Sequence, residues 1–196
     1  MLGAIGNARA TFGSAVGFVN RQIIQLLKRM GVLKLGRHMF SEDMGSSAEH
    51  NTRVDLKSKR KVPFKFHVEA YADLAKFLDP SSDGFLTWEF GEGSYVDLPQ
   101  IAEKAPIDSG YIKLVPYKTL IYEFYFKGRG NRRYRYYGSK DLLQLDQIKA
   151  WTTLKGEVTE VKSGKKVLES TTFFAEGSAL DRIKVIVPFL LSMKVR

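Results

Sequence analysis

The stretch LIYEFYFKGRGNRRYRYY, residues 120–137, decides the fold. Apolar side chains recur at every second position along its first half, which places them on one face of a β-strand. Residues 128–131, GRGN, have the composition of a turn, and residues 132–137 return as the partner strand. The side chains expected on the apolar side of this hairpin are Leu120, Tyr122, Phe124, Phe126, Tyr134 and Tyr136. The stretch therefore predicts an antiparallel hairpin with one apolar face.

Two-residue alternation continues on both sides of the hairpin. It predicts further strands at residues 64–69, 85–90, 111–115, 150–161 and 166–174. Residues 91–109 are predicted to form a loop, because glycines and prolines punctuate them. Successive strands joined by short turns indicate a mainly β protein with an antiparallel meander.

A basic leader, residues 1–62, precedes the predicted β domain, residues 63–196. The leader holds 11 Lys and Arg against 4 Asp and Glu, in a chain whose net charge is +10. Apolar residues at helical spacing between residues 14 and 35 predict an amphipathic helix that begins near Ser14. Residues 41–62 are interpreted as a linker that ends in the basic run 57–61.

Two interpretations of the leader helix remain open. Its apolar face packs on the sheet, or the helix docks on an anionic membrane or a partner. The residues assigned to such a docking surface are Arg21, Ile23, Leu27, Lys28 and Arg29. At the other end of the chain, residues 178–196 predict a short helix, an irregular turn and a closing strand at 191–195.

The chain shows neither a membrane-spanning stretch nor a secretory signal. No stretch is long enough without charge to cross a bilayer, and the N-terminus lacks the basic region of a secretory signal. We therefore expect a cytoplasmic protein, peripheral to a membrane if the leader binds there.

Catalytic and cofactor motifs are missing from the chain. It contains no cysteine, its three histidines are far apart, and no G-x-S-x-G, H-E-x-x-H, Walker or G-x-G-x-x-G pattern occurs. We therefore expect no catalytic residues, no metal and no cofactor. Glu123 has two interpretations: an interior carboxylate that needs a partner, or an exterior one paired with Arg133 or Arg135 across the hairpin.

Six short motifs follow one another along the chain: DLAKFLDP at 73–80, GYIKL at 110–114, LIYEF at 120–124, YYGSK at 136–140, WTTL at 151–154 and LSMKV at 191–195. Together they resemble the lipocalin-like β domain attached to some glucose–methanol–choline oxidoreductases, including cholesterol-oxidase-like proteins. The resemblance implies a calycin-like antiparallel barrel whose interior holds a lipid or sterol, without a flavin site. The basic leader and the apolar stretch 180–190 depart from this pattern and favour membrane contact.

These observations predict a non-enzymatic binding domain for an apolar ligand, a lipid or sterol-like molecule, at or near a membrane surface. The six apolar hairpin side chains either line the ligand site or simply fill the barrel. One alternative is an accessory domain that docks on a flavin-dependent oxidoreductase. Another is a single-stranded nucleic-acid binder, since arginines and tyrosines interleave on the hairpin, although no RNP-like or KH-like motif accompanies them.

Overall fold

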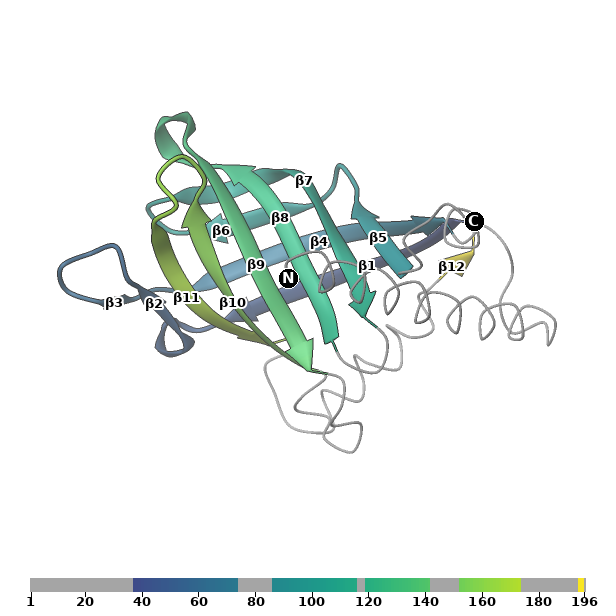
Figure 1. Cartoon of the computed structure of the whole chain (residues 1–196), viewed down its shortest axis with the longest axis horizontal. Coiled ribbons are helices and arrows are strands. Elements are labelled where there is room, and N and C mark those ends of the chain that lie inside the picture. The colour runs from purple at the N-terminus through teal and green to yellow at the C-terminus, as the bar shows by residue number, and fades with distance from the viewer. Residues whose placement is uncertain (1–36, 74–85, 116–118, 142–151, 174–193, 196) are drawn as a thin grey trace, which may run out of the picture.

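A computed structural model of the chain describes residues 37–73, 86–115, 119–141, 152–173 and 194–195 (Figure 1). Its strands and short 3₁₀ helices are β1 (Arg37–Ser46), η1 (Ala48–His50), β2 (Asn51–Arg53), β3 (Arg60–Lys61), β4 (Phe64–Asp73), β5 (Leu86–Phe90), β6 (Tyr95–Leu98), β7 (Ala102–Val115), β8 (Thr119–Lys127), η2 (Arg129–Asn131), β9 (Arg133–Asp141), β10 (Thr153–Glu160), β11 (Lys166–Phe173) and β12 (Lys194–Val195).

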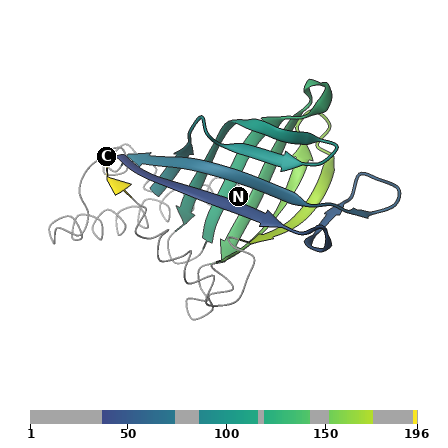
Figure 2. The same ribbon diagram turned by 180° about the vertical axis from the view of Figure 1, so that it is seen from behind.

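The sheet closes on itself. Its order runs β1–β4–β5–β7–β8–β9–β10–β11, and β11 returns to β1 through the pair Gly45↔Phe173. In the described part of the chain these strands form a closed barrel of eight antiparallel strands, seen from two sides in Figures 1 and 2. The prediction of a mainly β, antiparallel barrel is confirmed.

The hairpin predicted from residues 120–137 is confirmed as β8 and β9. The two strands pair at nine positions, from Thr119↔Asp141 to Lys127↔Arg133. Between them the chain turns through η2, where Gly130 has a φ of 69°. This left-handed conformation is readily adopted by glycine because it has no Cβ. The turn residues and the alternation therefore act together to set the register.

Two other predictions are wrong. Residues 41–62 are not a linker, because they contain most of β1 and all of β2 and β3, and β1 pairs with β4 at ten positions. The barrel thus begins before residue 62. The alternation in β1 is hidden because two of its buried residues, Glu42 and Ser46, are polar. Residues 91–109 are not a loop either, since they contain β6 and the first part of β7.

The interior side chains become smaller along β4. Its buried positions, in chain order, are Phe64, Phe66, Val68, Ala70 and Ala72. At the large end the rings pack together: the ring centroids of Phe66 and Phe124 are 5.2 Å apart, and those of Phe124 and Tyr136 are 4.8 Å apart. Aromatic rings therefore fill one half of the barrel. In the other half the small side chains of β4 lie beside the larger rings of β5, because Ala70 pairs with Phe90 and Trp88 is also buried.

Several predicted elements lie outside the described residues. These are the leader helix and the helix of the apolar tail. Of the predicted closing strand, residues 194–195 are described; they form β12, which pairs antiparallel with β1. Among the described residues, no helix has the length and hydrophobicity to cross a membrane.

Candidate ligand site inside the barrel

Five of the six predicted ligand-facing side chains are buried inside the barrel. They are Tyr122, Phe124, Phe126, Tyr134 and Tyr136, whereas Leu120 is partly buried and packs against this core. Phe126 stacks on Tyr134 with centroids 5.6 Å apart, and Phe124 on Tyr136. The rings of Phe124, Phe126, Tyr134 and Tyr136 therefore pack against one another. The candidate ligand site lies on the opposite side of Tyr122 from these rings.

A charged cluster crosses the interior at the level of Tyr122. The ammonium Nζ of Lys140 lies 2.7 Å from Glu42 Oε1, and the Tyr122 hydroxyl donates to Glu42 Oε2 at 2.7 Å. The side chains of Lys140 and Glu42 are only 5% and 1% exposed. The Lys140 Nζ also lies 4.9 Å from the centre of the Tyr122 ring. Each polar atom of the cluster therefore touches another member of it.

The cluster links opposite walls of the barrel. Glu42 is on β1, whereas Tyr122 and Lys140 are on β8 and β9, half-way round the ring of strands. Tyr122 and Glu42 are 80 residues apart in sequence. The aromatic half lies on one side of the cluster. On the other side are the small side chains of β4 and the partly buried pair Leu114↔Leu120.

Burial and a neighbouring carboxylate keep the proton on the Tyr122 phenol. Burial, and then the neighbouring Glu42 carboxylate, raise the pKa of the Tyr122 phenol well above its ordinary value. The phenol therefore remains protonated and donates to Glu42. Glu42 and Lys140 form the ion pair of the cluster.

Sequence analysis missed both charged members. Lys140 has the same parity along β9 as Tyr134 and Tyr136, so strict alternation could have placed it inside. Glu42 lies in the segment interpreted as a linker, where no strand was expected. Lys and Glu are rarely buried unless they are paired with an opposite charge. An interior position could therefore be assigned to Lys140 only once Glu42 was known to be its partner.

The Tyr136 hydroxyl is a second polar group in the interior, on the wall formed by β9, β10 and β11. The Tyr136 ring packs over Gly138 and Gly156, which face each other across β9 and β10. A Cβ atom at Gly156 would lie 2.5 Å from the Tyr136 hydroxyl oxygen, so glycine makes room for it. Burial raises the pKa of this phenol, and Ser170 and Thr172 on β11 oppose part of the rise. The wall built by β9, β10 and β11 is therefore more polar than the wall built by β4.

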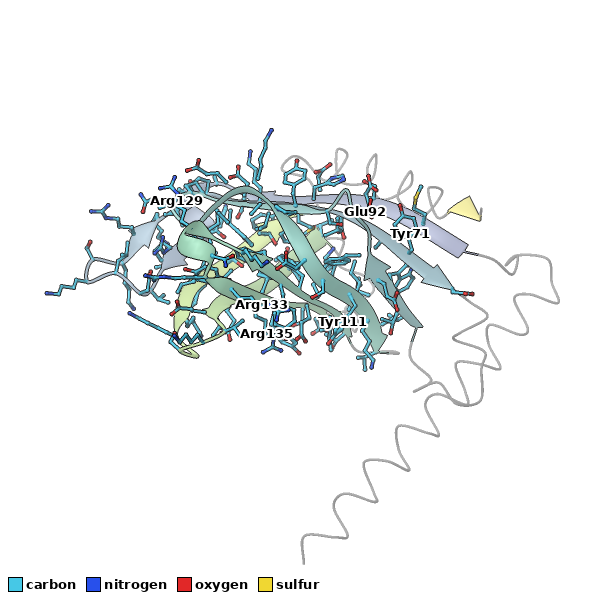
Figure 3. The ribbon with its side chains drawn as sticks, turned by 90° about the horizontal axis from the view of Figure 1, so that it is seen from above. Tyr71, Glu92, Tyr111, Arg129, Arg133 and Arg135 are labelled. Carbon is cyan, nitrogen blue, oxygen red and sulfur yellow. The ribbon has the colours of Figure 1, made fainter. Side chains whose placement is uncertain are left out.

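Glu123 lies on the outside of the barrel, as the second interpretation predicted. Its carboxylate accepts from Arg135 Nε at 2.9 Å, and also from the hydroxyls of Tyr111 and Tyr125 at 2.8 and 2.9 Å. Figure 3 shows Tyr111, Arg133 and Arg135 along the same side of the barrel. The guanidinium groups of Arg133 and Arg135 lie over the rings of Tyr125 and Tyr137. These rings already have cationic partners, which does not favour base stacking on them.

His67 also faces outward, where it bridges two strands. Its Nδ1 lies 2.9 Å from Asp43 Oδ1, its Nε2 lies 3.4 Å from Ser41 Oγ, and its ring stacks on Tyr95. Ser, His and Asp are the residue types of a hydrolytic triad. Here the Asp43 side chain is 82% exposed, so water screens its charge from the imidazole. We assign the group to strand pairing between β1 and β4.

An open groove of about 460 Å³ runs next to this group on the outer face. Two acids and two lysines line it, namely Asp43, Asp97, Lys65 and Lys104, so their charges balance. In the described part of the chain, no cluster of three or more His, Asp or Glu residues could hold a metal ion.

Comparison of the chain with protein-family models, with curated proteins and with solved structures finds no match. The fold defines the structural class of the protein. Among the residues described, it is a closed, antiparallel β-barrel of eight strands. The resemblance to the oxidoreductase-associated domain receives no support from these comparisons, and docking on an oxidoreductase stays a prediction.

Proposed function

We propose that the barrel is a non-enzymatic binding domain for an apolar ligand, a lipid or sterol-like molecule that carries one polar group. The observation that supports this most is the Glu42–Lys140 ion pair, which crosses an otherwise largely apolar interior beside the small side chains of β4. The ligand's apolar body would lie against Ala70, Ala72 and the Leu114–Leu120 pair. Its polar group would meet the charged cluster.

Stability alone gives little reason for such a pair. Desolvating two charges offsets most of their mutual attraction, and apolar residues of similar volume often serve a folded core as well or better. Burial, and then Glu42, raise the pKa of the Tyr122 phenol that donates to this pair, and such perturbed groups in protein interiors are concentrated at functional sites. The pair is therefore best explained as a recognition element in the ligand site.

Trp88 gives a direct test, because its buried side chain lies on β5, and Trp151 is the other tryptophan of the chain. In a Trp151→Phe background, titration with a sterol or a long-chain lipid should change the Trp88 fluorescence saturably. Ala72→Phe should abolish this binding, because its ring would take the position proposed for the ligand's apolar body. Thr171→Phe, on the half-exposed face of β11, is the matched control. A folded wild type that binds no such probe and co-purifies with no lipid by native mass spectrometry would refute the proposal.

A membrane surface is the second part of the proposal. Ten exposed cations lie in or next to the turns at one barrel end: Lys57, Lys59, Arg60, Lys61, Lys127, Arg129, Arg132, Arg133, Lys162 and Lys165. These turns are joined, since Val161 N donates to Arg133 O at 2.9 Å and Lys165 Nζ to Asp55 O at 3.5 Å. Glu103 and Glu160 pair with Arg129 and Arg132, and Val161 is 44% exposed beside them. Cations next to an exposed apolar side chain suit an anionic lipid surface.

The leader and this basic end can be tested separately. Full-length protein should sediment with phosphatidylserine vesicles at low salt, and less at high salt because of screening. Ile23→Glu with Leu27→Glu removes the leader's apolar stripe, and Lys57→Gln with Lys59→Gln reduces the charge of the basic end. Loss of sedimentation in either variant identifies the surface used. Wild-type protein that stays in the supernatant while retaining single-stranded DNA would favour the nucleic-acid alternative.

A further inference from the structure

We propose that the polar group of the ligand is a neutral hydroxyl, as in a sterol or a long-chain alcohol, and that the barrel excludes carboxylates such as fatty acids. This inference rests on the proposed ligand-binding function and names its ligand class. It follows from the balance of charge and of hydrogen-bond donors at Glu42.

Charge balance is the first argument. Among the described residues, Glu42 and Lys140 are paired with each other inside the barrel, at 2.7 Å. Glu42 therefore already supplies a negative charge next to the ammonium before a ligand enters, and Lys140 has a further interaction besides this pair. A ligand carboxylate would place a second negative charge beside Glu42 where water is excluded, and like charges in one site repel strongly.

Hydrogen-bond capacity is the second argument. A carboxylate oxygen can accept more than one hydrogen bond, and Glu42 Oε1 and Oε2 receive one each from Lys140 and Tyr122. Tyr122 donates its own proton to Glu42 and keeps an oxygen that can accept. A ligand hydroxyl, which both donates and accepts, matches this pair of groups. A carboxylate only accepts and has no proton to give to Glu42.

The experiment compares an unbranched long-chain alcohol with the carboxylic acid of the same chain length, at a pH where the acid is ionised. Affinity is read from Trp88 fluorescence in the full chain, with Trp151→Phe present in the wild type and in every variant. Wild-type protein should bind the alcohol at least about tenfold more tightly than the acid. Glu42→Gln keeps the side-chain size but removes the negative charge, and it leaves the Lys140 ammonium without its counter-ion. This variant should reverse the preference toward the acid.

A double variant, Glu42→Gln with Lys140→Gln, removes both charges and should return the preference to the alcohol. Circular dichroism and a thermal melt establish that each variant is folded. The wild-type comparison alone decides the ligand class even if a variant fails to fold. Wild type that prefers the acid overturns this inference but leaves the ligand-binding function standing. Wild type that binds neither probe overturns the function itself. A folded Glu42→Gln variant that still prefers the alcohol would show that Glu42 does not set the selectivity.

Discussion

Replacing Lys140 by methionine tests whether the charged cluster is truly buried and coupled. Methionine has a similar length and no charge, so the substitution leaves the Glu42 carboxylate in the interior without its counter-ion. At the 2.7 Å separation of the two charged atoms, their attraction is roughly 6 kcal/mol for an effective dielectric constant of about 20. Desolvation of the two ions offsets most of this in the wild type.

The single substitution removes the attraction but not the burial of Glu42. Removing one partner of a buried ion pair costs about 3–5 kcal/mol. For a chain of this size, about 2–4 °C of melting temperature corresponds to each kcal/mol, so the melting temperature should fall by roughly 6–20 °C. Adding Glu42→Gln to Lys140→Met should recover a large part of this loss, because no charge is then left buried.

Urea denaturation of the wild type, both single variants and the double variant completes a double-mutant cycle. Lys166→Met is the matched control. Lys166 contacts Glu157 at 2.7 Å on the surface, and its side chain is 40% exposed, so its removal should leave the melting temperature nearly unchanged. A loss for Lys140→Met no larger than for Lys166→Met, or additive effects in the cycle, would refute the buried pair.

Three further predictions concern other parts of the barrel. Gly156→Ala should destabilise the fold by about 2 kcal/mol or more, because its Cβ would lie 2.5 Å from the Tyr136 hydroxyl and 2.7 Å from the Tyr137 carbonyl oxygen. Gly164→Ala, with open space and a φ of 67°, should cost only about 1 kcal/mol in the same melt. Partial burial alone would raise the pKa of Glu123, but hydrogen bonds from Arg135, Tyr111 and Tyr125 outweigh it and lower the pKa. Such a carboxylate stabilises the fold above its unfolded pKa and loses that contribution as the pH falls through its lowered folded pKa. Glu123→Gln should therefore cost about 1 kcal/mol near pH 7 and progressively less as the pH falls below about 4 in urea titrations. A fluorophosphonate should leave Ser41 unmodified by intact-mass analysis, and labelling that disappears in His67→Ala would instead identify a hydrolytic site.

Alternation and turn chemistry determined the local part of this structure. The hairpin of β8 and β9 was predictable because its pairing is between neighbours in sequence, and inward and outward side chains follow from parity alone. The exterior pairing of Glu123 with Arg135 follows from the same register, since the two residues are 12 apart in the chain. Polar residues at the inward positions of β1 broke the pattern, and the strand was missed for that reason.

Closure of the barrel decided the rest. Glu42 and Lys140 are 98 residues apart, and no local pattern predicts that they meet. They lie together only because β11 pairs with β1 and closes the barrel. Closure places β1 across the interior from β8 and β9. Parity says that a side chain points inward, but which inward side chains face each other depends on how the whole sheet curls. The candidate site is formed by contacts across the barrel interior, so its charge balance comes from the tertiary structure.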